Sequence, residues 1–227
     1  MHKSSMIFGK LFFDLYGLPH HRILDVGSRN YEGALRDFAP SGSENVGLDF
    51  EAGPGVDIVL TDPYHFPVDS GAFDIVTASS CFEHSEFFWL TFEEMIRVLK
   101  PGGLIYLNSP SNGDFHRYPV DCWRFYPDSG IALQNWARRQ GQQVTLVESF
   151  VGETMDGIYN DFVAVFVKGG MSDVLTKRRM TERARFTNAR TGADEGIRNH
   201  RQISPDQRRM PIRYWLRRLR YIGKAFS

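Results

Sequence analysis

The pattern of hydrophobic and polar positions predicts strands that alternate with helices over the first 170 residues. Short apolar runs, typical of buried strands, occur at residues 23–26, 46–50, 56–60, 73–79, 104–107, 144–150 and 162–168. Apolar residues at helical spacing predict helices at residues 6–18, 31–38, 87–100 and 127–140. No run is long and apolar enough to cross a bilayer.

The order of these elements predicts the fold class. Strands that alternate with helices favour an α/β protein whose mostly parallel sheet carries helices on both faces. No long helix separates the last two of the seven strands, so we expect them to form an antiparallel hairpin at one edge of the sheet.

Charged residues divide the chain into two regions. The 227 residues include 27 Lys or Arg and 27 Asp or Glu, yet residues 171–227 hold 15 of the basic and only 5 of the acidic side chains. The 42% hydrophobic content is enough for one complete core. We therefore expect one domain at residues 1–170 and a basic, partly flexible extension at residues 171–227.

Acidic residues and a glycine follow the first two predicted strands. Asp25 and Gly27 end the first strand, and Asp49 ends the second. A glycine lets a ligand approach the backbone, and a carboxylate at the end of the second strand accepts hydrogen bonds from ribose hydroxyls. This arrangement predicts a site for a nucleoside cofactor.

The glycine loop disfavours a dinucleotide in this site. The dinucleotide fingerprint G-x-G-x-x-G has three glycines, whereas residues 27–33 read Gly-Ser-Arg-Asn-Tyr-Glu-Gly. Asp25 would face a pyrophosphate unfavourably but suits a cationic ligand. A nicotinamide cofactor is therefore the weaker interpretation.

Five motifs occur in sequence order between residues 20 and 168. They are Leu24-Asp25-Val26-Gly27, Asp49, Asp62, Phe73-Asp74-Ile75-Val76 followed by Glu83-His84, and the run R-V-L-K-P-G-G from Arg97 to Gly103. In this order and spacing the chain resembles the class I S-adenosylmethionine-dependent methyltransferases, within the group often called type 11. The resemblance implies a Rossmann-like fold, methyl transfer, and S-adenosyl-L-methionine as the cofactor.

The resemblance also implies which residues bind the cofactor, with the ribose on Asp49 and the adenine near Asp62. The full expected set is Asp25, Gly27, Ser28, Arg29, Asp49, Phe50, Asp62, Pro63 and Ser79. Arg29 departs from the family, which commonly has a second glycine there, and it either pairs with the methionine carboxylate of the cofactor or points to solvent. Each of the three aspartates has an alternative interpretation as a residue that only caps a turn.

Two histidines are candidates for a general base. His84 follows the fourth strand at the ligand-binding edge, and an imidazole can remove a proton near neutral pH. His116 is the rival base, and the Glu83-His84 pair has a purely structural alternative in shaping its loop. No metal site is predicted. The motif Asp62-Pro63-Tyr64 follows the third strand, whereas the D-P-P-Y motif of nucleic-acid amino-methyltransferases follows the fourth, so we reject base methylation.

Residues 108–126 form a connection that is too long for an ordinary turn between a strand and a helix. It mixes aromatic, charged and histidine side chains, and methyltransferases of this family recognise the acceptor in this region. We expect Tyr118, Asp121, Trp123 and Arg124 to bind the acceptor, with Phe125 in the core. The predicted reaction is O-methylation of a small molecule or glycan, with N-methylation or a non-catalytic cofactor-binding module as alternatives.

The basic extension has its own pattern. Residues 177–190 are arginine-rich and suit a solvated helix, residues 191–205 are polar, and residues 211–226 form an amphipathic helix with one basic face. Such a helix suits an anionic membrane surface, or docking on the acidic domain or a partner subunit, more than it suits nucleic acid. Cys81 and Cys122 are too few for a disulfide framework, so we expect a cytoplasmic protein, with the inner face of the membrane as a peripheral location.

Overall fold

The computed structural model describes residues 3–31, 33–154 and 159–202. Its helices are α1 (Lys3–Tyr16), α2 (Phe88–Val98), α3 (Asp128–Arg139) and α4 (Asp173–Lys177), with short 3-10 helices η1 (Leu35–Phe38), η2 (Phe82–His84) and η3 (Met180–Glu182). Its strands are β1 (Arg22–Val26), β2 (Glu44–Asp49), β3 (Ile58–Val59), β4 (Phe73–Ser79), β5 (Leu99–Pro110), β6 (Val144–Gly152), β7 (Asp161–Lys168), β8 (Phe186–Thr191) and β9 (Asp194–Arg198). The first seven strands are those that the sequence predicts.

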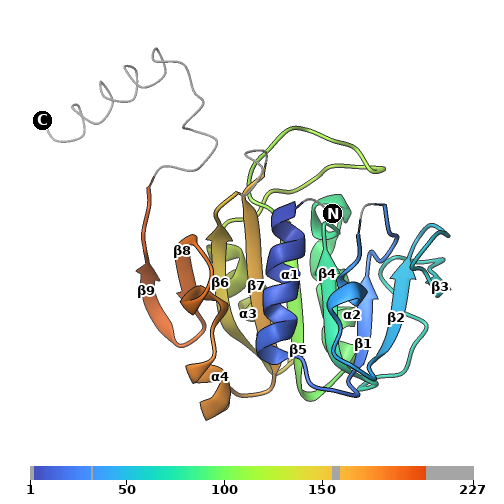
Figure 1. The fold of residues 1–227 in the computed structure, drawn as a ribbon, viewed down its shortest axis with the longest axis horizontal. Coiled ribbons are helices and arrows are strands. Elements are labelled where there is room, and N and C mark those ends of the chain that lie inside the picture. Colours follow the sequence, from blue (N-terminus) through green and yellow to red (C-terminus); the bar gives the residue numbers. More distant parts are fainter. Residues whose placement is uncertain (1–2, 32, 155–158, 203–227) are drawn as a thin grey trace, which may run out of the picture.

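The strands form one sheet in the order β3-β2-β1-β4-β5-β7-β6-β8-β9 (Figure 1). Strands β1 to β5 are parallel, and β7 runs antiparallel between β5 and β6. This arrangement confirms the predicted Rossmann-like α/β fold with antiparallel strands on one side. The chain order reverses at β1, whose neighbours are β2 and β4, and such a switch point is where α/β sheets bind ligands.

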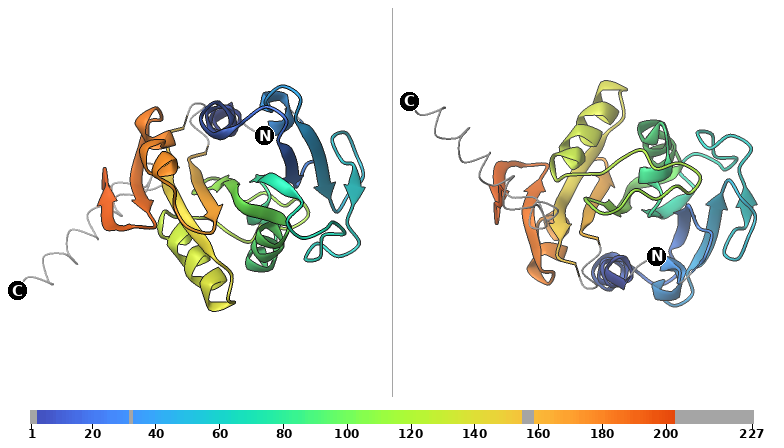
Figure 2. Two further views of the ribbon diagram at one scale, coloured as in Figure 1. Left: turned by 90° about the horizontal axis from the view of Figure 1, so that it is seen from below. Right: turned by 90° about the horizontal axis from the view of Figure 1, so that it is seen from above.

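Helices cover both faces of the sheet. Figure 2 shows α1 on one face, with α2 and α3 on the opposite face. Phe12 of α1 lies against Tyr106 of β5, and their ring centroids are 4.8 Å apart. On the other face Phe92 of α2 contacts Phe166 of β7, with centroids 4.9 Å apart. All four side chains are buried, so each face of the sheet has its own core.

Residues after 170 extend the sheet instead of forming the expected arginine-rich helix. β8 pairs antiparallel with β6, and β9 pairs with β8. Burial alternates along β8, where Thr187, Ala189 and Thr191 are buried. The open edge of β6 offers unpaired backbone N–H and C=O groups. Hydrogen bonds to these groups favour a strand here, although the sequence is polar. The amphipathic helix expected at residues 211–226 lies outside the described residues.

A buried carboxylate attaches this extension to the domain. Glu148 on β6 is fully buried and accepts hydrogen bonds from the Tyr16 hydroxyl at 3.1 Å and from the Met180 backbone at 2.6 Å. The backbone and hydroxyl of Thr181 donate at 3.2 and 2.9 Å. Glu148 therefore joins α1, β6 and η3.

Candidate active site

A cavity of about 860 Å³ lies where the parallel strands end. Val26 of β1, Asp49 of β2 and Ser79 of β4 form part of its wall. His116 and Tyr118, from the long connection between β5 and α3, line it from above, and Figure 1 shows this lime-green connection arching over the end of the sheet. The volume lies in the range of small-molecule and cofactor sites.

The turn after β1 is built for close approach to the backbone. Gly27 has φ of +76°, and a Cβ atom at this position would lie 2.9 Å from the Cβ of Cys81. The backbone N–H groups of Gly27 and Ser28 donate to the Leu48 carbonyl at 2.9 and 3.0 Å. These bonds hold the glycine turn against β2, beside Asp49.

Two groups on the cavity wall suit a nucleoside cofactor. Asp49 accepts backbone N–H groups from Arg29 at 3.0 Å and from Glu51 at 3.1 Å, one on each oxygen, and each oxygen keeps acceptor capacity for a ribose hydroxyl. The Ser79 hydroxyl is buried and has no hydrogen-bond partner within the described part of the chain. Together with the Gly27 turn, these groups fit the predicted cofactor.

Arg29 lines the cavity with its charge already paired. Its guanidinium forms an ion pair with Glu51 and lies 5.0 Å from the ring centre of Tyr31. The hydrogen bond to Glu51 raises the pKa of Arg29. A pairing of Arg29 with the carboxylate of the cofactor would have to compete with Glu51, so that role stays a prediction.

Three other expected cofactor residues do not line the cavity. Asp25 lies within β1, where Thr77 donates to its carboxylate at 2.7 Å, and burial raises the pKa of Asp25 to about 6. Ser28 is buried behind the glycine turn. Asp62 accepts a hydrogen bond from the Tyr64 backbone at 2.9 Å, which is the alternative that its position before a proline suggested. Phe50 and Pro63 do line the cavity.

The two candidate bases meet on the opposite wall. The rings of His84 and His116 are 5.1 Å apart between centroids, and both residues line the cavity. The His84 Nδ1 lies 2.5 Å from the Val120 carbonyl oxygen. A carbonyl only accepts, so Nδ1 carries the proton and Nε2 carries the lone pair. Burial lowers the pKa of His84, which favours this neutral form.

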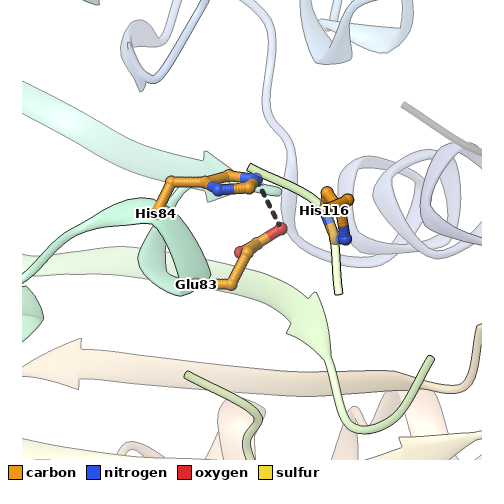
Figure 3. Close-up of side chains that lie close together, drawn as sticks. All are labelled: Glu83, His84 and His116. Atoms are coloured by element: carbon orange, nitrogen blue, oxygen red, sulfur yellow. Dashed lines mark ion pairs between the residues drawn. The ribbon is translucent and has the colours of Figure 1, made fainter. Parts of the chain in front are cut away.

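Glu83 stands beside both histidines. Its side chain is 1% exposed, and its Oε1 atom lies 3.8 Å from the Nε2 atom of His84 (Figure 3). Burial raises the pKa of Glu83 to about 7. Its backbone carbonyl accepts from Cys122 at 2.7 Å and from Trp123 at 3.3 Å. Glu83 thus connects η2 to the long connection that carries His116.

Asp121, Trp123 and Arg124 hold that connection in place and are not among the residues that line the cavity. Arg124 donates to both oxygens of Asp121, at 2.5 and 2.9 Å, and this hydrogen bonding lowers the pKa of Asp121 to about 2. Asp121 also accepts the backbone N–H of His116 at 2.7 Å. The Trp123 indole donates to the Ser85 carbonyl at 2.9 Å. Their direct contact with an acceptor stays a prediction, as does that of Tyr118, which does line the cavity.

Sequence reasoning missed some cavity residues. Tyr31 and Tyr64 both line the site, and each belongs to a segment that the sequence singled out without assigning the tyrosine itself a role. The Tyr31 ring lies 5.1 Å from that of Tyr118, and the Tyr64 ring 5.4 Å from that of Phe87. An aromatic residue beside a glycine turn or a strand end is a usable signal, but the pairing of Tyr31 with Tyr118 of the long connection follows from tertiary structure alone.

Comparisons with known proteins agree with this geometry. The family model described as a methyltransferase domain matches residues 24–107. No curated protein matches the chain. Many solved structures share the fold, and three of them are described here. The first is the 1,6-didemethyltoxoflavin-N1-methyltransferase of Burkholderia thailandensis with bound 1,6-didemethyltoxoflavin and S-adenosylhomocysteine (16% identity, 74% of this chain and 79% of that chain, TM-score 0.56).

The second solved structure is a protein of Methanococcus maripaludis described as an S-adenosylmethionine-dependent methyltransferase (17% identity, 74% of this chain and 87% of that chain, TM-score 0.51). The third is the cyclase SpnF (15% identity, 73% of this chain and 82% of that chain, TM-score 0.52). Because this fold occurs in a cyclase as well as in methyltransferases, the fold alone does not specify methyl transfer, and the support for it comes from the methyltransferase domain matched at residues 24–107.

The glycine turn and the carboxylate at the end of β2 lie at the ends of the strands that the matched domain contains. Residues 24–107 match a methyltransferase domain, and this match supports an S-adenosylmethionine-dependent methyltransferase with S-adenosyl-L-methionine as the cofactor. In the part of the chain that the structure describes, no helix combines the length and apolar character needed to cross a bilayer.

Proposed function

We propose that the enzyme methylates a hydroxyl oxygen of a small molecule or glycan. One observation carries this proposal: the His84 imidazole lines the cavity with a free lone pair on Nε2. Its Nδ1 proton is donated to the Val120 carbonyl. A hydroxyl is a weak nucleophile until its proton is removed, so methyl transfer to oxygen benefits from a group that activates it. His84 can accept the proton directly. The His116 ring lies beside the His84 ring, so His116 is the second candidate base.

The remaining residues of the site bind and orient. S-adenosyl-L-methionine, when bound, supplies an electrophilic methyl group. Asp49 and Ser79 offer hydrogen-bonding atoms on the sheet side of the cavity, where the ribose is expected. His116 belongs to the long connection, and His84 lies beside it. The acceptor would therefore bind between the cofactor and the two histidines, and alignment of the reacting atoms supplies a large part of the rate enhancement.

Aromatic side chains favour an acceptor that presents a ring. Tyr31, Phe50, Tyr64 and Tyr118 all line the cavity. Tyr31, Phe50 and Tyr118 are each about half exposed, at 52%, 49% and 49%. Exposed aromatic rings pack against the apolar faces of sugars or of planar molecules, while their hydroxyls form hydrogen bonds. The cofactor adenine would occupy part of this surface and the acceptor the rest.

Transfer of an isotope-labelled methyl group tests the proposal. The full-length protein is incubated with labelled S-adenosyl-L-methionine and a panel of mono- and oligosaccharides, hydroxylated aromatic compounds and amines. The proposal predicts a labelled methyl ether, identified by mass spectrometry, and its loss in His84→Ala. A labelled amine as the exclusive product would favour N-methylation, and cofactor binding without any product across the panel would favour the non-catalytic module.

We also propose a cytoplasmic location, with the basic extension at the inner face of the membrane or docked on the protein itself. The chain has two cysteines, Cys81 and Cys122, which are too few for a disulfide framework, and such usage suits a reducing compartment. Sedimentation with anionic and neutral vesicles tests whether the basic extension binds a membrane surface. Binding only to anionic vesicles, lost on removal of residues 203–227, would support the membrane role, and equal behaviour of both proteins would contradict it.

A further inference from the structure

We propose that Glu83, His84 and His116 together bind a divalent transition-metal cation that activates the acceptor hydroxyl. This inference rests on the proposed O-methylation, and in it the cation, rather than the His84 imidazole, activates the hydroxyl. One ligand-type atom from each of the three side chains lies within 4.8 Å of the other two. Figure 3 shows the Glu83 carboxylate directed toward the His84 ring, with the His116 ring to the side of both.

The hydrogen bonds of the two imidazoles are those of metal ligands. The Nδ1 atom of His84 donates to the Val120 carbonyl at 2.5 Å, and the Nδ1 atom of His116 lies 3.0 Å from the Asp114 carbonyl oxygen. Both rings therefore keep a lone pair on Nε2. Metal-binding histidines commonly donate their other N–H to a carbonyl or carboxylate, which fixes the tautomer and aims the coordinating nitrogen.

Glu83 supplies an independent observation. Its side chain is 1% exposed, and its Oε2 atom has no hydrogen-bond partner among the described residues. The nearby cation Arg124 is directed at Asp121 and two backbone carbonyls. A buried carboxylate oxygen without a partner is costly, and a cation between Glu83 and the two imidazoles would remove that cost.

The ligand set selects the class of cation. Two imidazoles and one carboxylate suit Mn²⁺, Fe²⁺, Co²⁺ or Zn²⁺ and leave coordination positions open, whereas Mg²⁺ and Ca²⁺ prefer oxygen ligands. Bonds of about 2.1 Å bring neighbouring ligands to about 3 Å from one another. The three side chains therefore need to move closer together, and His116, 38% exposed on a loop, has room to do so.

The open positions give the cation its role. A hydroxyl oxygen bound there has a lowered pKa, so its O–H bond breaks and the proton passes to solvent water. The oxygen electron pair then forms the new bond to the methyl carbon, whose bond to sulfur breaks to leave S-adenosylhomocysteine. In this assignment the two imidazoles are ligands and no protein base is required.

Cobalt binding tests the site without any need for turnover. The purified full-length protein, freed of metal with a chelator, is titrated with Co²⁺ while its visible absorption is recorded. Variants are Glu83→Gln and His116→Ala, and the matched control is His65→Ala, an exposed histidine also near a glutamate. The expected result is one cobalt per chain in wild type and His65→Ala, with binding weakened by at least ~10-fold in the other two variants.

S-adenosylhomocysteine titration of each variant confirms that it is folded. The inference is overturned if Co²⁺ fails to bind at about 1:1, or if His116→Ala and Glu83→Gln bind it as tightly as the control. Methyl transfer at full rate after chelation would also overturn it, while leaving O-methylation intact. Cobalt bound at this site without any methylated hydroxyl product would support the site and contradict the proposed function.

Discussion

The hydroxyl of Thr77 on β4 donates a 2.7 Å hydrogen bond to the carboxylate of Asp25 on β1. Both side chains are buried at paired positions of these two parallel strands, and Asp25 stands two residues before Gly27. The hydrogen bond offsets part of the cost of burying a carboxylate, yet burial prevails and raises the pKa of Asp25 to about 6.

This relationship makes stability depend on pH. The folded pKa of Asp25 is above the unfolded value, so its contribution to stability is complete below about pH 4 and is lost as the pH rises through about 6. Asp25→Asn removes this dependence. Relative to the variant, the wild type should lose about 2 kcal/mol of unfolding free energy between pH 4 and pH 7, at about 1.4 kcal/mol per pKa unit. Urea unfolding across this range measures the difference, and parallel pH profiles would contradict the assignment.

Glu148→Ala should destabilise the protein strongly. The change leaves the backbone donors of Met180 and Thr181 and the Thr181 hydroxyl without their buried acceptor, while the Tyr16 hydroxyl keeps the Arg178 carbonyl. We expect a loss of roughly 3 kcal/mol in the free energy of unfolding. The control Glu44→Ala removes an exposed ion pair with Arg22 and should cost under about 1 kcal/mol. Denaturant unfolding compares them, and equal losses would show that Glu148 does not anchor the C-terminal strands.

Arg124→Ala should affect the acceptor and spare the cofactor. Arg124 holds Asp121, and Asp121 in turn holds the backbone of His116. Loss of this support should raise the acceptor KM several-fold, while S-adenosylhomocysteine affinity stays within about twofold. Arg124→Lys should recover part of the loss, because lysine keeps the charge but not the two-pronged geometry. An equal loss of cofactor affinity would argue against a separate role for this connection.

The sequence predicted the strands well because each buried strand is a continuous apolar run, which can be recognised from local sequence. The residues Ile23 to Val26 are apolar apart from Asp25, and such a run suits a strand covered on both faces. The motifs at Gly27, Asp49 and His84 come at strand ends, and parallel topology brings those ends to one edge of the sheet. The cofactor side of the cavity could therefore be predicted from the order of the motifs.

The parts that were not predicted depend on tertiary partners. β8 contains Thr187 and Arg190, a polar pattern that becomes a strand only because the edge of β6 is available. Asp121 and Arg124 look like binding residues in a sequence, yet they pair with one another. Glu83 was seen only as half of a motif, and its position between two histidines depends on a loop that starts about 30 residues later.

Calorimetric titration with S-adenosyl-L-methionine, S-adenosylhomocysteine and NAD, on the wild type and Asp49→Ala, measures whether this cavity binds the sulfur cofactor through Asp49. We expect the two sulfur ligands to bind at roughly micromolar concentration and NAD not to bind. Asp49→Ala should lose at least ~10-fold in affinity, since a hydrogen bond to a charged group contributes about 1.5–3 kcal/mol. Asp69→Ala, which removes an exposed carboxylate away from the cavity, serves as the control. Undetectable binding of both sulfur ligands up to about millimolar concentration, or equal binding by Asp49→Ala and the control, would contradict this expectation.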